Sequence, residues 1–138
     1  MNQILRLWWP LLVAVMLLQA GNGLTGTLIS VTSEARAFAP WLKGLILSAF
    51  YVGSLAGALV APATIARSSH ITSFAGFTLL LVAATAGYAL TDLSFAWIML
   101  RFMAGFGISG MFATVESWLN LGTQDGWRAR VFSIYIMV

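Results

Sequence analysis

Residues 20–33 read AGNGLTGTLISVTS, and residues 104–117, which begin 84 positions further along the chain, read AGFGISGMFATVES. One Ala, three Gly, one Val and one Ser recur in register, and three further positions carry similar residues. Both stretches lie inside long apolar segments, and two other apolar segments separate them. A repeat of three membrane-spanning segments is the internal symmetry of many secondary transporters, so this repeat favours solute transport. Coincidence is the alternative, because small residues are common in membrane helices.

The composition is that of a chain surrounded by lipid. Of the 138 residues, 60% are hydrophobic and only 8% are charged, whereas about a quarter of the residues of a soluble domain are charged. The sequence pI is about 10.0, but the seven basic residues are scattered and form no stripe beside aromatic residues. This pattern excludes a nucleic-acid partner. With no Cys, one His and four acids, neither a disulfide framework nor a catalytic metal cluster is expected.

Four segments are long and apolar enough to cross a membrane, which requires about 20 mostly apolar residues. They cover residues 7–31, 41–66, 71–90 and 95–122, and a partial fifth covers 129–138. The first segment is longer than the apolar core of a signal peptide, so we interpret it as a retained helix. The sequence therefore predicts an all-α integral membrane protein, with four transmembrane helices and the start of a fifth in one domain of residues 1–138. Because the chain ends inside an apolar run, we expect a fragment of a longer protein.

The short connections carry most of the charges and predict the orientation. One side holds Arg6, Arg67, His70, Asp125, Arg128 and Arg130, and the other holds Glu34, Arg36, Lys43 and Asp92. The excess of arginine on the first side places the N-terminus in the cytoplasm, in an inner membrane of bacterial type. All six Trp residues lie near predicted span ends, which is typical of an aromatic belt at the membrane interface.

The glycine-rich stretches match G-x-G-x-x-G at residues 21–26 and 105–110. A dinucleotide fingerprint needs a strand before the glycines and a helix that opens at them. Both copies lie midway along apolar segments, so no dinucleotide is predicted, and no other cofactor motif occurs. Glycines at helical spacing instead let two backbones approach closely. The second span repeats small residues every four positions, at Ala49, Gly53, Gly57 and Ala61.

Motifs of enzymes and ATP-driven pumps are missing. The sequence contains no P-loop, and it contains neither G-x-S-x-G nor H-E-x-x-H. We therefore predict no enzymatic activity and no bound nucleotide.

The fourth span carries nearly all of its polarity in one stripe. At about 100° per residue, a face about 100° wide holds Arg101, Gly105, Ser109, Phe112, Glu116 and Asn120. A charge near the bilayer centre is costly and usually faces the bundle interior or a water-filled cavity. Snorkelling toward the helix ends is the alternative for the two charged residues, which cannot pair because about 22 Å of helix separates them.

The first span has a matching polar face that includes Gln19 and Asn22. Amides and hydroxyls there suit either hydrogen bonding to a substrate or hydrogen bonding between helices. The candidates for lining a cavity are thus Gln19, Asn22, Ser109, Glu116 and Asn120.

The pattern Arg101-x-x-x-Gly105-x-Gly107, near the start of the fourth span, resembles the helix 4 motif of the major facilitator superfamily. The stretches Glu116-Ser-Trp-Leu-Asn120 and Arg128-Ala-Arg130-Val-Phe-Ser-Ile-Tyr135 are similar to the YcaD-like branch of that superfamily. The resemblance covers essentially the whole chain. It implies a twelve-helix transporter whose helices 1 and 4 line a central cavity. It also implies that Arg101, with the two glycines, belongs to a motif associated with proton coupling.

The loop between the second and third spans departs from the family pattern, which usually reads G-x-x-x-D-R-x-G-R-R. Only the first glycine, Gly57, is kept, and Ala61 replaces the acid. The charge network that joins this loop to helix 4 in the family is therefore in doubt here. The candidates for the cytoplasmic loop and gate are Arg67, His70, Asp125 and Arg130.

The sequence thus favours the N-terminal fragment of a secondary transporter that moves a small solute by alternating access. Its expected partners are the lipid bilayer, the solute and the remaining transporter helices. A complete small multidrug-type transporter that oligomerises is an alternative, although such pumps depend on an acid in their first helix, and here no acid precedes Glu34. A membrane subunit that packs through its glycines without transporting is a third interpretation.

Overall fold

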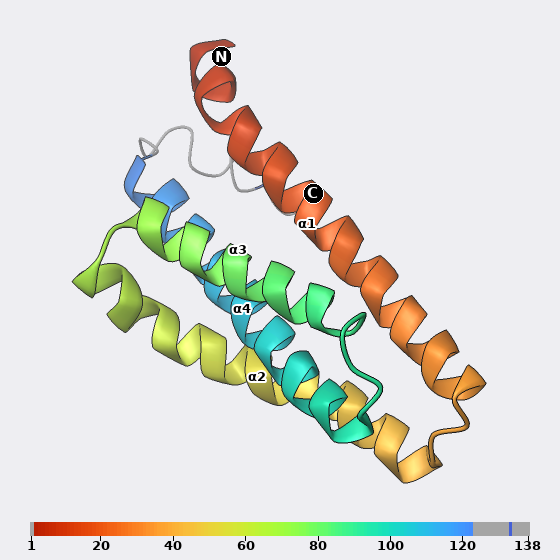
Figure 1. Cartoon of the computed structure of the whole chain (residues 1–138). Helices are drawn as coiled ribbons and strands as arrows, with labels where there is room; N and C mark the ends of the chain where they lie inside the picture. Colours follow the sequence, from red (N-terminus) through yellow and green to blue (C-terminus); the bar gives the residue numbers. More distant parts are fainter. Residues whose placement is uncertain (1, 123–132, 134–138) are drawn as a thin grey trace. The chain divides into compact units, whose positions relative to one another are not determined.

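The computed structural model describes residues 2–122 and residue 133, and within that range the chain forms four helices joined by short turns (Figure 1). They are α1 (Asn2–Ala35), α2 (Pro40–Arg67), α3 (His70–Gly87) and α4 (Ser94–Gly122). Each is long and apolar enough to cross a membrane, over Trp9–Ala35, Pro40–Arg67, His70–Gly87 and Ser94–Leu121. The predicted all-α membrane fold class is confirmed for the described part of the chain. The predicted partial fifth helix lies outside the described residues.

Local sequence signals explain where these helices begin and end. Pro40 opens α2, where its missing N–H costs nothing, and the preceding Ala39 has the extended ψ of 142° that proline favours in its neighbour. Ser69 caps α3, because its hydroxyl accepts a hydrogen bond from the backbone N–H of Thr72 at 3.2 Å. The third helix ends at Gly87 rather than at residue 90, since the next residues form a hydrogen-bonded turn.

The chain divides into two compact units, residues 1–36 with 122–138 and residues 37–121. In the first unit the described structure is essentially α1, whose helix extends beyond the predicted 7–31 at both ends. Its hydroxyl side chains bond to carbonyls of their own helix. Thr25 donates to the Gly21 carbonyl at 2.8 Å, and Ser30 donates to the Gly26 carbonyl at 3.1 Å. Such bonds satisfy a hydroxyl in lipid without a partner helix.

In the second unit α4 contacts both other helices. It runs parallel to α2, because Gly53 and Gly57 of α2 meet the backbone of Phe102 and Phe106 in the same order along the two chains. It runs antiparallel to α3, because Gly107 meets the backbone of Phe77, near the middle of α3, while the His70 ring at the start of α3 bonds to Ser117 near the end of α4.

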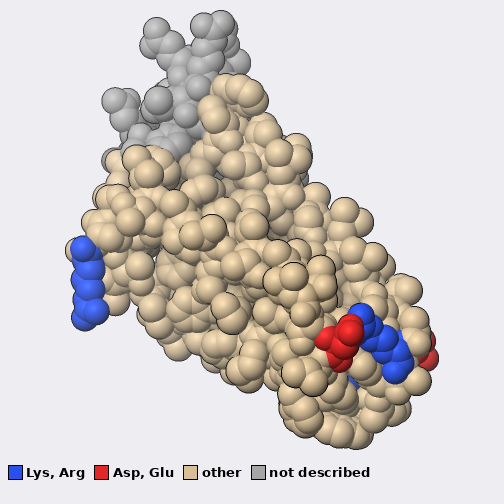
Figure 2. Space-filling model, in the orientation of Figure 1, with Lys and Arg blue, Asp and Glu red and all other residues tan. Residues whose placement is uncertain are grey.

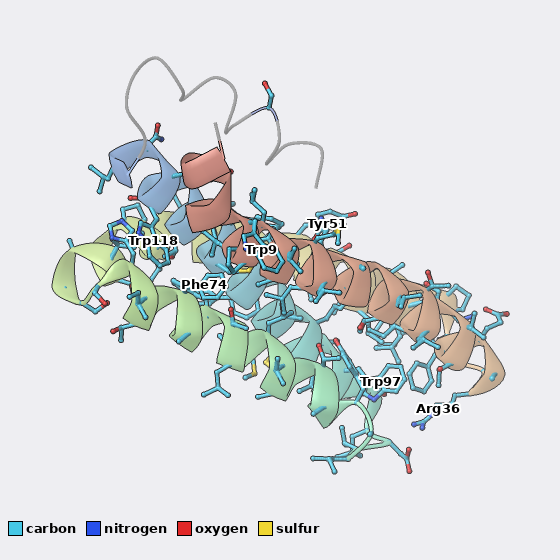
Figure 3. All side chains as sticks on the ribbon, turned by 90° about the horizontal axis from the view of Figure 1, so that it is seen from above. Trp9, Arg36, Tyr51, Phe74, Trp97 and Trp118 are labelled. Carbon is cyan, nitrogen blue, oxygen red and sulfur yellow. The ribbon has the colours of Figure 1, made fainter. Side chains whose placement is uncertain are left out.

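Apart from Arg101 and Glu116, which lie within α4, the described charged side chains lie near helix ends, as expected for a membrane protein. On the face drawn in Figure 2, one patch holds both acidic and basic side chains, a second patch holds basic side chains alone, and no charged side chain shows between the two. Trp97 and Trp118 lie at opposite ends of α4 (Figure 3). Trp97 lies in the first turn of α4, at a span end as predicted, but it is buried. Its indole is only 2% exposed, so it packs inside the unit rather than facing the membrane interface.

Candidate functional site

The glycines of α4 pack against neighbouring helices. A Cβ added at Gly105 would collide with the backbone of Phe50 and Ser54 on α2. A Cβ at Gly107 would lie 2.8 Å from the Phe77 carbonyl oxygen and 3.0 Å from the Leu81 nitrogen, both on α3. The packing interpretation of the G-x-G-x-x-G pattern is therefore confirmed for α4, since only glycine permits these close approaches.

The α2 glycines make the reciprocal contacts. Added Cβ atoms at Gly53 and Gly57 would collide with the backbone carbonyls of Phe102 and Phe106 on α4. Each of these glycines thus directs a Cα hydrogen at a carbonyl oxygen of the partner helix, a weak interaction that recurs between closely packed helices. The α2–α4 pair is consequently in direct backbone contact at these positions.

Arg101 lies in the second turn of α4 and is buried, with 7% of its surface exposed. Its guanidinium carbon lies 4.7 Å from the centre of the Phe50 ring. A cation over an aromatic face is worth about 2 kcal/mol when it is shielded from water. The head group therefore packs against α2 and does not snorkel to an exposed position.

Phe50 explains the spacing of the Arg-x-x-x-Gly motif. Residues four apart lie on one face of a helix, so Arg101 and Gly105 both face α2. Gly105 admits the Phe50 backbone, and the ring of the same residue then lies beneath the guanidinium one turn earlier. The glycine thereby determines how the arginine is packed.

Two nitrogens of this guanidinium, Nε and Nη1, are buried without a hydrogen-bond partner among the described residues. The Tyr88 hydroxyl, which follows α3, is buried and lies beside this guanidinium. Burial raises the pKa of Tyr88 to about 12, although the nearby Arg101 guanidinium acts in the opposite direction. The hydroxyl therefore stays protonated at physiological pH and remains a neutral donor.

Aromatic rings fix the Tyr88 side chain. The Trp97 ring meets Tyr88 edge to face at 5.4 Å and meets Phe38 at 5.5 Å. The Trp97 Nε1 donates to the Thr91 carbonyl at 3.0 Å, so the indole has already used its only donor. The sequence predicted Arg101 but missed Phe50, Tyr88 and Trp97. The available signal in the sequence was that Arg101 follows Trp97 by one turn near the start of the fourth span. This spacing does not identify partners on other helices.

The other predicted cavity residues are dispersed. On α4, Ser109 is half-buried, whereas Glu116 and Asn120 are exposed. The stripe through Arg101 therefore changes from buried to exposed along the helix. Gln19 and Asn22 lie midway along α1, in the other unit.

The start of α3 is joined to α4 through the side chains of His70 and Ser117. The His70 Nε2 and the Ser117 Oγ lie 3.1 Å apart, and the His70 ring lies 6.2 Å from that of Trp118. At the same junction, the hydroxyl of Ser68, which follows α2, lies 2.9 Å from that of Ser73 in the first turn of α3. Arg67 is exposed, and two further gate candidates, Asp125 and Arg130, lie outside the described residues. Among the described residues, no group of three or more His, Cys, Asp or Glu side chains could hold a metal.

Comparison with known proteins finds relatives that are named as transporters. Over 128 residues, or 93% of this chain, the sequence is 27% identical to the uncharacterized MFS-type transporter YcaD of Escherichia coli O45:K1 (strain S88 / ExPEC). The protein of the same name from Escherichia coli O139:H28 (strain E24377A / ETEC) matches with the same identity and coverage. The predicted resemblance to the major facilitator superfamily and its YcaD-like branch is therefore confirmed.

The match covers 34% of each relative, so the chain spans about a third of the length of the curated relatives that it matches. No family model matches the chain, and no solved structure matches it. The four apolar helices support a multi-pass membrane protein, and both relatives are named as transporters.

Proposed function

We propose that this chain is the N-terminal part of a secondary transporter that moves a small solute by alternating access, with proton coupling. The observation that carries the proposal is the similarity to MFS-type transporters over 93% of the chain. The buried Arg101 in the motif position supports it, because an ionised side chain within a transmembrane helix usually serves a transport pathway. Residues 1–138 then form part of one transmembrane domain, and no catalytic role is assigned to any residue.

Transport by the whole protein is the direct test. The protein that contains this chain and its remaining helices would be reconstituted in liposomes with a trapped pH-sensitive dye, and solutes would be added in classes. We expect proton movement linked to one class of solute in those liposomes, and none with residues 1–138 alone. A monodisperse monomer of residues 1–138 that transports solute would contradict the assignment as a part of a longer transporter.

We further propose that the N-terminus lies in the cytoplasm of a bacterial-type inner membrane. Arg67 ends α2 and His70 begins α3, so both lie at one end of this helix pair, whereas Lys43 and Asp92 lie toward the other end. The arginine-rich side faces the cytoplasm under the positive-inside rule.

Cysteine labelling tests this orientation, and the chain offers a background without cysteine. Ala66 is exposed in the last turn of α2, and Leu90 is 85% exposed in the turn after α3. An impermeant thiol reagent added outside intact cells should label Leu90→Cys and spare Ala66→Cys until the membrane is opened. Labelling of Ala66→Cys alone in intact cells would reverse the orientation.

A further inference from the structure

The connection between α1 and α2 contains two residues that separate the backbone tied to one helix from the backbone tied to the other. The N–H of Arg36 donates to the Thr32 carbonyl at 2.9 Å, so Arg36 still belongs to the hydrogen-bond pattern of α1. The carbonyl of Ala39 accepts from the N–H of Leu42 at 2.9 Å, so Ala39 is already tied to α2. A change of direction between the two helices therefore falls on residues 37–38.

The first of these residues, Ala37, has an unfavourable backbone conformation. Its φ is 52°, and it is the one residue other than glycine with a positive φ in the described part of the chain. The Cβ of alanine disfavours this left-handed conformation by roughly a factor of ten in an equilibrium constant. The boundary between the two compact units falls directly before Ala37. The strain is thus located where one unit ends and the other begins.

The second residue, Phe38, is held by an aromatic contact. Its ring meets the Trp97 ring edge to face at 5.5 Å. Trp97 is only 2% exposed, and it is fixed on another side by the Tyr88 ring at 5.4 Å and by its own hydrogen bond to the Thr91 carbonyl. Phe38 is only half-buried. Within this unit, Trp97 is therefore the fixed partner and Phe38 is the one that can leave.

The strain at Ala37 and the contact of Phe38 oppose each other. While the Phe38 ring packs on Trp97, the chain keeps the positive φ at Ala37. If the ring leaves Trp97, Ala37 is free to return to a negative φ. An edge-to-face aromatic pair contributes roughly a two- to tenfold preference, which is similar in size to the cost of the left-handed alanine. The two arrangements are consequently close in free energy.

We propose that Ala37 is a hinge about which α1 rotates relative to the α2–α4 unit, and that Phe38 is a latch that closes this hinge by packing on Trp97. The inference rests on the proposed transport function, because alternating access requires helices to change their positions. Two candidates for lining a cavity, Gln19 and Asn22, lie on α1 and move with it.

The hydroxyl bonds within α1 are compatible with such a rotation. Thr25 donates to the Gly21 carbonyl, Ser30 donates to the Gly26 carbonyl, and both bonds stay inside the same helix. A rotation of α1 as a rigid body therefore preserves these bonds, and the change in backbone dihedrals is confined to the residues beside the latch.

The test measures how fast a single cysteine on α1 reacts with N-ethylmaleimide in the intact transporter in detergent. The chain contains no cysteine, and any cysteine in the remaining helices is replaced by serine. Gln19→Cys and Leu24→Cys serve as separate reporters, and both positions are exposed on α1. Gln19 precedes Ala37 by 18 residues, or about 27 Å of helix, so the reporter does not touch the hinge.

Two substitutions should shift the hinge in opposite directions. Ala37→Gly removes the strain of the positive φ, because glycine has no Cβ, and it favours the latched arrangement. Phe38→Ala removes the ring and favours the released arrangement. The reaction rates of the two variants should lie on opposite sides of the rate of the reporter protein and should differ from each other at least threefold at one of the reporters.

Phe95→Ala is the matched control. Phe95 lies in the first turn of α4, two residues before Trp97, and is 68% exposed. This variant removes the same side chain without opening the latch, so it should react as the reporter protein does. Elution as a single species in size-exclusion chromatography shows that each variant is intact. If Phe38→Ala is not intact, Ala37→Gly decides the test alone, since glycine adopts the existing φ without strain.

The outcomes are distinct. Opposite shifts in Ala37→Gly and Phe38→Ala, with none in Phe95→Ala, support the hinge and its latch. Equal rates in all variants at both reporters, shifts of the two variants in the same direction, or a shift in Phe95→Ala equal to that in Phe38→Ala would overturn the proposal.

The failure of the hinge is distinguishable from the failure of the transport assignment. Solute transport by the whole protein, with unchanged labelling in the hinge variants, would retain the transporter and reject the hinge. Opposite shifts in labelling in a protein that moves no solute would retain the hinge and reject the transporter.

Discussion

The two copies of the glycine-rich repeat, residues 20–33 in α1 and 104–117 in α4, have similar sequences and different surroundings. Their local structure agrees, since Ser30 donates to the Gly26 carbonyl and its counterpart Thr114 donates to the Gly110 carbonyl. Their packing differs. Within its own unit, no described atom lies within 4 Å of a Cβ added at Gly21, whereas its counterpart Gly105 touches the α2 backbone.

The serines that end the two copies differ in the same way. Ser33 bonds to the Ser30 carbonyl of its own helix at 2.9 Å, whereas Ser117 lies 3.1 Å from the His70 ring on α3. The comparison teaches that the repeat fixes which residues are small or hydroxylated, while neighbouring helices decide whether these residues pack, bond across helices or bond locally.

The largest expected effect comes from alanine at the first pair of equivalent glycines. Gly105→Ala should destabilise the protein by about 3 kcal/mol, because its Cβ would push α2 away and separate Phe50 from Arg101. Gly21→Ala should instead stabilise α1 by up to about 1 kcal/mol through helix propensity. Unfolding of both variants by SDS titration in mixed micelles measures the difference, and equal effects at the two positions would remove the distinction between the copies.

Two glycines of the same helix should also differ in their response to alanine. This pair tests whether packing, rather than a difference between helices, decides the change in stability. On α2, a Cβ added at Gly53 would collide with the Phe102 backbone, while a Cβ added at Gly44 would meet no described atom within 4 Å outside its own helix backbone. Gly53→Ala should cost about 2–3 kcal/mol, and Gly44→Ala should leave stability unchanged or slightly higher. Thermal unfolding by circular dichroism tests this pair, and a larger loss from Gly44→Ala would show that the described packing is incorrect.

A smaller difference is expected between the equivalent serines. Ser117→Ala removes the bond between α4 and His70 and should cost about 1 kcal/mol. Ser33→Ala removes a bond within α1 and should change stability by less than about 0.5 kcal/mol. If the two substitutions prove equal in SDS titration, the His70–Ser117 bond contributes nothing measurable to holding the α2–α3 loop against α4.

The smallest effect is expected where the two copies agree. Thr114→Val and Ser30→Ala each remove a hydroxyl bonded to the carbonyl four residues earlier, and that carbonyl also belongs to the helix ladder. Both should shift the unfolding free energy by less than about 0.5 kcal/mol. A loss well above that value at Thr114 alone would mean that its hydroxyl has a role beyond its own helix.

Much of the fold followed from the sequence. The four spans were predictable because length and hydropathy add along the chain, and boundaries such as Pro40 and the Ser69 cap have local causes. The end of α3 was misplaced by three residues, because residues 88–90 remain apolar although the backbone turns there. The packing role of the glycines was also predictable, since four-residue spacing aligns them on one helix face.

The site was only partly predictable. Arg101, Gly105 and Gly107 could be identified from their spacing and from the resemblance, and the burial of Arg101 agrees with the expected cost of a charge in lipid. Phe50 and Tyr88 could not, because they lie 51 and 13 residues before Arg101 and belong to other parts of the bundle. No local pattern predicts which aromatic ring a neighbouring helix will place over a guanidinium.

By itself, therefore, the sequence determined the number of described spans, the small residues that permit close helix contacts, and the presence of two charged residues, Arg101 and Glu116, within the fourth span. The tertiary structure decided which glycines are used, that His70 bonds to Ser117, and that Arg101 meets Phe50 and Tyr88. The physical reason is that hydropathy and helix formation depend on neighbours in sequence. The rotation of each helix about its axis, which selects the contacting side chains, depends on how whole helices pack against one another.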